Sequence, residues 1–175
     1  MSLQAVRRDP GHVEREKRFL AAHTASHDRI YRYFRRRTAD AATAEDLCSE
    51  VFRIAWEKLA GSGELSVMLL FGVAKNVLRN HDRSASRSAD LLGALRAERR
   101  DAAPAQDSHV QEALERLSPD EREVLLLTYW DGFTSQEVSD LLNTSATAVR
   151  MRLHRARKAL SHLIQTQPQV EGAEL

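Results

Sequence analysis

Arginine and lysine side chains are concentrated in one stretch near the C-terminus, where they could bind a polyanion. No Asp or Glu occurs between Asp140 and Glu171. Five cations occupy that interval: Arg150, Arg152, Arg155, Arg157 and Lys158. Positive charge of this density attracts a phosphate backbone, and arginine can also form paired hydrogen bonds with guanine. Taken alone, however, such a cluster is more often the solvated face of an ordinary helical hairpin. The neighbouring sequence is needed to distinguish this from a nucleic-acid-binding face.

Short helices separated by tight turns are expected to position these cations. Three hydroxyl residues stand where N-caps are expected: Ser118, Thr134 and Ser145. Glu121 and Glu137 follow the first two after three positions, as in a capping box, and Pro119 suits the first helical position. The first helix is expected to stop at Gly132. Asn143 is expected to form the turn before the third helix, because Asn tolerates the left-handed conformation.

The third of these helices combines an apolar stripe with the basic residues. Its apolar residues recur at helical spacing: Val149, Leu153, Ala156, Leu160 and Leu163. This stripe would anchor the helix to a core and leave the cations on the other faces. Two helices joined by a short turn, the second exposed and basic, are typical of a helix-turn-helix that reads a major groove. The caps and the turn therefore favour DNA binding over a merely solvated face.

A helix predicted over 43–60 carries a polar stripe opposite an apolar one. The apolar stripe consists of Leu47, Val51, Ile54, Ala55 and Leu59. The polar stripe follows at steps of four, three and four: Asp46, Glu50, Arg53 and Glu57. It is either a solvated face or a docking surface for a basic partner, and spacing does not distinguish the two. Cys48 lies beside the apolar side and is expected to be a small buried hydrophobe.

Two further helices are predicted in the N-terminal half. One spans 13–37, where Phe19, Leu20, Ile30, Tyr31 and Phe34 recur loosely at helical spacing. His23 and His27 on it are spaced for metal binding, but no carboxylate or cysteine completes a ligand set, so we expect no metal site. The other runs from about 65 to 83 and mixes cations with amides on its polar face: Lys75, Asn76, Arg79, Asn80 and Arg83. Such residues can hydrogen-bond to bases or phosphates, although a solvated face is the alternative.

Length alone suits one domain or two small ones, but the helical patterns and the polar stretch between them predict an all-α protein of two small helical domains joined by a flexible linker. The 175 residues are 42% hydrophobic, and the formal net charge is only +1. We assign 1–11 to a disordered tail, 12–85 to the first domain, 86–109 to the linker, 110–168 to the second domain and 169–175 to a tail. The single cysteine excludes an intrachain disulfide, and no apolar run approaches the length of a membrane span. A cytoplasmic location is therefore expected.

Three stretches together resemble the extracytoplasmic function (ECF) sigma factors of the sigma-70 family. Residues 44–59, Ala-Glu-Asp-Leu-Cys-Ser-Glu-Val-Phe-Arg-Ile-Ala-Trp-Glu-Lys-Leu, resemble the helix that binds core polymerase. Residues 70–80, Leu-Phe-Gly-Val-Ala-Lys-Asn-Val-Leu-Arg-Asn, resemble the promoter-melting helix. Residues 117–163 resemble region 4, which binds the upstream promoter element. The stretches follow the family's order and cover most of the chain.

The resemblance implies an initiation factor that binds core RNA polymerase, through the clamp and flap of its large subunit, and directs it to selected promoters. It implies no catalytic step, cofactor, metal or membrane insertion. The implied polymerase contacts are Asp46, Glu50, Arg53 and Glu57. The implied contacts with the −10 element are Lys75, Asn76, Arg79, Asn80 and Arg83. The implied contacts with the −35 element are Ser145, Thr147, Arg150, Met151, Arg152, His154, Arg155, Arg157 and Lys158. Whether an anti-sigma factor masks these surfaces is left open.

Departures from the family pattern and two other protein classes limit what the resemblance predicts. Asn143 replaces the usual turn glycine, Met151 replaces a small hydroxyl residue, and Met68 and Leu69 stand where a Trp is usual, so the promoter sequence is not predicted. A helix-turn-helix regulator that does not bind polymerase is one alternative. A nucleic-acid-processing enzyme is the other. The acidic and amide-rich helices argue against the first, and the lack of clustered carboxylates or metal ligands argues against the second.

Overall fold

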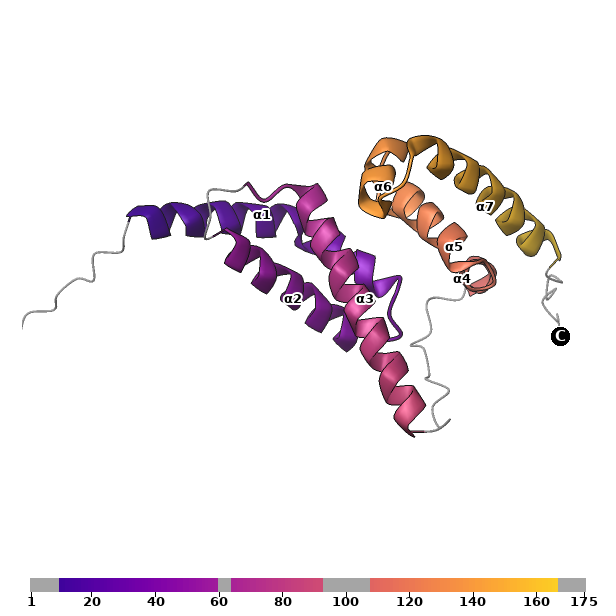
Figure 1. Ribbon diagram of the computed structural model, residues 1–175, viewed down its shortest axis with the longest axis horizontal. Coiled ribbons are helices and arrows are strands. Elements are labelled where there is room, and N and C mark those ends of the chain that lie inside the picture. Colours follow the sequence, from indigo (N-terminus) through magenta and orange to yellow (C-terminus); the bar gives the residue numbers. More distant parts are fainter. Residues whose placement is uncertain (1–9, 60–63, 93–107, 167–175) are drawn as a thin grey trace, which may run out of the picture. The chain divides into compact units, whose positions relative to one another are not determined.

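Helices form the described parts of the chain, as the apolar periodicity predicts. The computed structural model describes residues 10–59, 64–92 and 108–166, and no strand occurs within these ranges. The chain divides into two units, Met1–Arg100 and Asp101–Leu175, which are described separately below (Figure 1). The predicted all-α fold class is confirmed. The predicted tail 169–175, most of the predicted tail 1–11 and much of the predicted linker lie outside the described residues. Pro10 and Gly11, assigned to the first tail, belong to the first helix. None of the described helices is both long and apolar enough to cross a bilayer.

The first unit is a three-helix arrangement around one apolar core. Helix α1 (Pro10–Arg35) packs against α2 (Ala41–Lys58), and α3 (Val67–Leu92) packs against both (Figure 1). The core includes Ile30, Tyr33, Phe34, Ala44, Cys48, Val51, Phe52, Ala55, Leu59, Leu70, Phe71, Val73, Ala74 and Val77. Burial raises the pKa of the Cys48 thiol to about 11, so this cysteine is a buried hydrophobe, as predicted.

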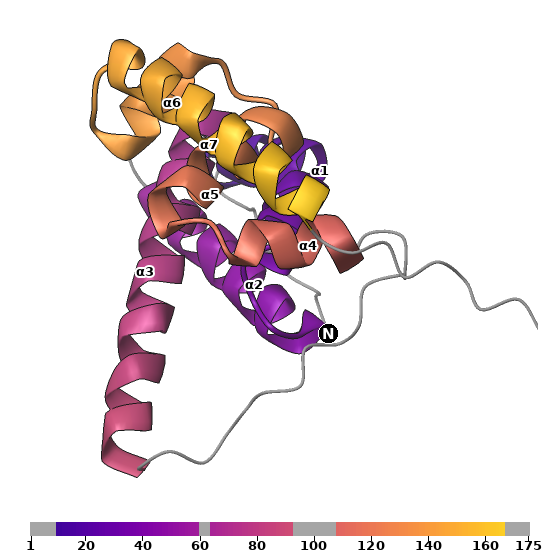
Figure 2. The same cartoon turned by 90° about the vertical axis from the view of Figure 1, so that its right-hand side faces the viewer.

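Helix boundaries in this unit differ from those predicted, for local reasons. Helix α2 begins at Ala41 because the Asp40 carboxylate caps it, accepting a hydrogen bond of 2.7 Å from the Thr43 N–H. Helix α3 continues to Leu92 instead of ending near Arg83, since no Gly or Pro occurs between Arg83 and Gly93. Figure 2 shows the C-terminal part of α3 extending beyond α1 and α2.

The apolar spacing of α1 identifies its core only in part. Ile30 and Phe34 are buried as that spacing suggests, but Leu20 is 62% exposed. Tyr33, which the spacing argument omitted, is buried and meets Phe71 edge to face at 5.5 Å between ring centroids. Arg37 lies over the Tyr33 ring at 3.8 Å, so the helix end adds a cation–π contact to this cluster.

His23 and His27 take part in the packing of α1 on α2. The His23 ring lies 4.4 Å from the Phe52 ring and 4.9 Å from that of His27, measured between centroids. Burial, and secondly the nearby His27, lower the pKa of His23. Within the described residues, no group of three or more His, Cys, Asp or Glu side chains is placed to hold a metal ion. Both imidazole rings pack against the Phe52 ring of α2, His27 at 5.9 Å between centroids.

The free energy of unfolding of the first unit is expected to fall as the pH drops below 6.5, the ordinary imidazole pKa. Because folding lowers the pKa of His23, the unfolded chain takes up the proton first. Stability is therefore intact above pH 6.5, declines from there to the lower folded-state pKa, and then levels off. His27 acts on His23 through its charge, and the His27 Nδ1 lies 3.6 Å from the Asp28 carboxylate. Urea unfolding at about pH 7.5 and about pH 5.5 should show the decline. The decline should be smaller in His23→Gln, and an equal decline in both proteins would contradict this assignment.

The second unit gathers four helical segments around the long C-terminal helix. They are α4 (Ser108–Glu115), α5 (Pro119–Leu125), the π-helical turn η1 (Leu126–Trp130) and α6 (Ser135–Leu142), and the long helix is α7 (Ala146–Thr166). Helices α4, α5 and α6 all contact α7. The core includes Ala113, Leu114, Leu117, Val124, Leu125, Leu126, Leu127, Phe133, Val138, Val149, Leu153 and Ala156. Leu160 and Leu163, at the end of the predicted apolar stripe, are half-buried.

The predicted caps and turn of the second unit are confirmed. The Glu121 N–H donates to the Ser118 hydroxyl at 3.4 Å, and that hydroxyl contacts the Glu121 carboxylate at 2.6 Å. Thr134 and Glu137 form the full reciprocal capping box. Asn143 adopts the left-handed conformation, with φ 51° and ψ 53°. The Ala148 N–H donates to the Ser145 hydroxyl at 3.1 Å. Helices α6 and α7 thus form the expected helix-turn-helix.

The segment before Gly132 departs from the single α-helix that was predicted. The α-helical register ends at Leu125, and the Asp131 N–H donates to the Leu126 carbonyl at 3.0 Å, the i to i−5 bond of a π turn. Gly132 then takes a positive φ of 77°, which ends the segment where predicted. The wider turn changes which side chains of this segment face the core.

Candidate functional site

The N-terminal half of α7 presents an exposed face of cations and hydrogen-bonding groups. Val149, Leu153 and Ala156 fix the opposite side of the helix in the core. Six predicted DNA-binding residues share the exposed face: Thr147, Arg150, Met151, His154, Arg155 and Lys158. The Arg150 Nη2 donates to the Thr147 hydroxyl at 3.3 Å, which draws its guanidinium toward the start of the helix. This is the end that a recognition helix directs at base edges.

Three other predicted DNA-binding residues are engaged within the unit. The Arg152 guanidinium lies 3.6 Å from the Asp120 carboxylate, and its side chain is only 28% exposed. The Arg157 guanidinium donates to the Tyr129 hydroxyl at 3.3 Å. The hydroxyl of Ser145 caps α7. The family resemblance grouped these residues with the other DNA contacts, but their own contacts direct them toward α5, toward η1 and into the turn.

Helix α3 carries the amide-rich face opposite its buried side. Phe71, Ala74 and Val77 are buried. Of the five predicted residues on the polar side, Asn76, Arg79, Asn80 and Arg83 are exposed, and Lys75 is half-buried. The Arg79 Nη2 donates to the Asn76 side-chain Oδ1 at 3.0 Å, so these two side chains form one polar group. The face is able to hydrogen-bond to bases and phosphates.

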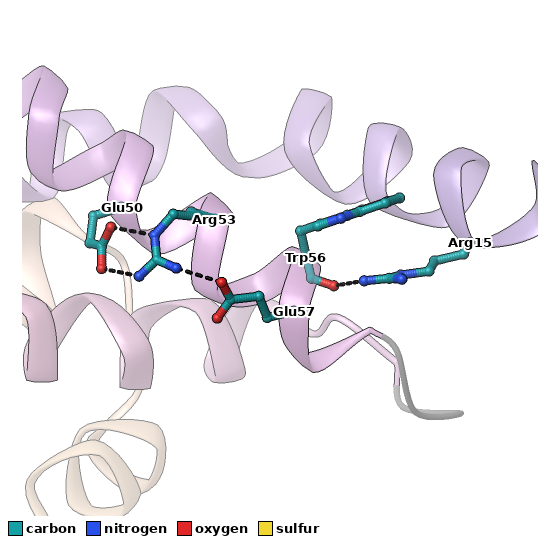
Figure 3. A network of polar contacts seen from close by, with 5 residues as sticks. All are labelled: Arg15, Glu50, Arg53, Trp56 and Glu57. Atoms are coloured by element: carbon teal, nitrogen blue, oxygen red, sulfur yellow. Dashed lines mark hydrogen bonds and ion pairs between the residues drawn. The ribbon is translucent and has the colours of Figure 1, made fainter. Parts of the chain in front are cut away.

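The acidic stripe of α2 is a bonded network (Figure 3). Arg53 donates to Glu50 through Nε and Nη2, at 2.7 and 2.6 Å, and to Glu57 through Nη1, at 2.5 Å. The hydrogen bonds and charge of Arg53 hold the pKa of Glu50 below its usual value. Asp46, one turn before Glu50, is also exposed. Three carboxylates and one guanidinium thus give this stripe a net negative charge on the side opposite the core.

Close to this network, Arg15 closes one end of the contact between α1 and α2. Its guanidinium lies 4.0 Å from the centroid of the Trp56 ring and donates to the Trp56 carbonyl (Figure 3). Phe19 meets the same ring edge to face at 5.2 Å. Trp56 is therefore part of the packing between α1 and α2. This packing holds α2, and with it the acidic stripe, in place against α1.

Sequence reasoning missed one exposed aromatic pair in the second unit. Tyr129 and Trp130 are 54% and 45% exposed. Together with Leu125, Leu160 and Ile164 they line a hollow of about 500 Å³ beside α7. An uninterrupted α-helix would place Tyr129 on the same face as the buried Leu125, four residues earlier, so periodicity assigns it to the core. The π turn removes it from that face.

Comparison with known proteins shows similarity to one group. The family model described as "Sigma-70, region 4" matches residues 109–160. The ECF RNA polymerase sigma factor SigM of Bacillus subtilis is 31% identical over 143 residues, which cover 77% of this chain and 87% of SigM. The probable RNA polymerase sigma factor RfaY of Xanthomonas campestris pv. campestris is 38% identical over 134 residues, which cover 69% of this chain and 34% of RfaY. The chain therefore spans about a third of the length of RfaY.

A solved structure supports the fold. The sigma factor RpoE of Bartonella quintana, crystallised with the anti-sigma factor NepR, superposes with a TM-score of 0.67. The match covers 87% of this chain and 98% of RpoE at 22% identity. The helical architecture of this chain is therefore one already known from a solved structure.

Proposed function

The chain belongs to the ECF sigma factors of the sigma-70 family, and on this basis we propose that it binds core RNA polymerase and directs it to selected promoters as an alternative sigma factor. The observation that carries the proposal is the exposed face of α7 within a capped helix-turn-helix. Its cations stand opposite Val149, Leu153 and Ala156 and are free of nearby carboxylates along their own helix. Such a face suits a major groove flanked by phosphates.

The second unit, within 110–168, is assigned to the −35 element of the promoter. Thr147, Arg150, Met151, His154 and Arg155 would face the groove, with Lys158 near the phosphates. Arg152 and Arg157, which contact Asp120 and Tyr129, would contribute less. Ser145 would act by holding the turn.

The first unit, within 12–85, is assigned two contacts from two different helices. The stripe Asp46, Glu50, Arg53 and Glu57 on α2 would dock against the clamp of the polymerase large subunit. The polar face of α3 would hold the −10 element while its strands separate, using Lys75, Asn76, Arg79, Asn80 and Arg83. Amides and guanidinium groups suit unpaired bases because they can donate to several base edges.

The exposed pair Tyr129 and Trp130 supports a protein contact in the second unit. We assign the hollow they line with Leu125, Leu160 and Ile164 to the flap of the polymerase large subunit. Exposed aromatic surface of this kind marks protein interfaces, whereas the α7 face assigned to DNA is polar apart from Met151.

The same proposal implies where the chain acts, which regulator could bind it and which protein carries out catalysis. The chain would act in the cytoplasm, where DNA and polymerase are, and catalysis would belong to the polymerase. An anti-sigma factor is included as a further partner, since the related RpoE was solved with NepR. A regulator that needs no polymerase is not favoured, because the similarity to SigM covers 77% of this chain and so extends beyond the second unit.

Transcription by purified core polymerase with and without the full chain tests the proposed function. Sequencing the 5′ ends of the transcripts from a genomic library should reveal start sites that need the chain, preceded by common upstream elements. If the chain binds DNA but changes no start site, the polymerase-independent regulator is the better description.

Alanine replacement of Arg79 and Asn80 should impair promoter opening more than binding of the closed duplex. Losing one charge-assisted hydrogen bond of about 1.5 kcal/mol corresponds to roughly a tenfold smaller open fraction. Permanganate footprints measure the opened bases, and filter binding at low temperature measures the closed complex. Arg18→Ala, which removes an exposed cation of α1, is the control and should change neither. Equal losses in both measurements would contradict the assignment of α3.

A further inference from the structure

Met151 is an apolar side chain at the centre of the polar face of α7. It is 62% exposed. At about 100° per residue it stands roughly 160° around the helix from both Val149 and Leu153, which are buried. The side chain therefore points almost directly away from the core of its unit.

Polar groups surround Met151 on every side of this face. Thr147 lies one turn before it, and His154 and Arg155 lie one turn after it, all exposed. Arg150 stands at one edge of the face and donates to Thr147. A surface with a cationic border and an apolar centre suits a ligand that is anionic at its edges and offers an apolar group in the middle. A protein interface more often has an apolar centre of several residues.

The major groove of DNA offers one apolar group, the C5-methyl group of thymine. The other groups on its floor are hydrogen-bond donors and acceptors, with which a thioether forms at best weak contacts. We propose that Met151 packs against a thymine methyl group and thereby specifies an A·T pair at one position of the upstream promoter element. This inference rests on the proposed function and names the base chemistry that α7 recognises.

Removal of that single methyl group should weaken binding in a position-specific way. Upstream elements would first be obtained by selection from randomised duplexes, using polymerase reassembled from core enzyme and the full chain. Each thymine of the selected element is then replaced by deoxyuridine, which lacks only the methyl group. One replacement should lower the affinity about fourfold, which corresponds to burial of one methyl group at about 0.8 kcal/mol.

The variant Met151→Ala should bind the thymine and deoxyuridine duplexes alike at that position, with its other base preferences kept. Leu20→Ala is a matched control, because Leu20 is also 62% exposed but lies in the first unit, on α1. It should retain the fourfold difference. If Met151→Ala retains the difference, or if no thymine is sensitive, the inference fails while the proposed function stands. If no sequence is selected at all, the proposed function fails and this inference with it.

Discussion

Reversing Asp46 and Glu50 to lysine is expected to weaken the complex with core RNA polymerase about a hundredfold or more. The two carboxylates lie one turn apart on the side of α2 opposite Ala44, Val51 and Ala55. A docking site complementary to this stripe must be basic, and placing like charges together in an interface costs several kcal/mol. Competition for core enzyme against a labelled copy of the unchanged chain measures the loss.

The double reversal should leave the folded first unit nearly intact. Glu50 loses its bonds to Arg53, but the pair is solvent-exposed, and such pairs contribute about 0 to 1 kcal/mol. Reversal of Glu112 and Glu115 on α4 is a matched control, since it makes the same change in net charge on two exposed carboxylates of the second unit. Equal binding of both double variants to core enzyme would contradict the assignment of the clamp contact to α2.

Alanine replacement of Arg150 or Arg155 is expected to cost about 1 to 3 kcal/mol of promoter binding when the side chain contacts a base. Both side chains flank the outward face of α7, and neither is needed by the core. A base contact would relax the preference at one position of the element. A phosphate contact would instead weaken all sequences alike and reduce the salt dependence by about one unit. Titration of the reassembled polymerase with selected promoters at several salt concentrations separates the two.

Arg152→Ala is the comparison within the same helix. Because this guanidinium faces Asp120 and its side chain is 28% exposed, its removal should have the smaller effect on promoter affinity. The assignment of α7 to the −35 element would be wrong if Arg150→Ala and Arg155→Ala both bound like the unchanged chain at every salt concentration.

Features governed by neighbouring residues were predictable from the sequence. The capping box of Thr134 and Glu137 needs only four consecutive residues, and the left-handed Asn143 depends on its own side chain and its place after α6. The opposed stripes of α2 were predictable because that helix keeps one period throughout its length. The resemblance to one family then supplied the candidate sites, which spacing alone could not assign.

Features that depend on packing were not predictable in the same way. Leu20 fits the loose apolar spacing of α1 but is 62% exposed, while its neighbour Phe19 packs on Trp56 of α2. Tyr33, which the spacing did not single out, packs against Phe71 of α3. The π turn exposes Tyr129 because the turn is one residue wider than the assumed period. Arg152 was grouped with the other cations because its contact with Asp120, on α5, is tertiary.

The network of Arg53 with Glu50 and Glu57 bears on the entropy of association. An interface normally immobilises long side chains at a cost of about 0.5 to 1.5 kcal/mol each. Arg53 holds both carboxylates by hydrogen bonds while the chain is free, so much of that rotational freedom is lost on folding and not on binding. The stripe on α2 is therefore preorganised, and it presents a fixed pattern of charge before any partner arrives.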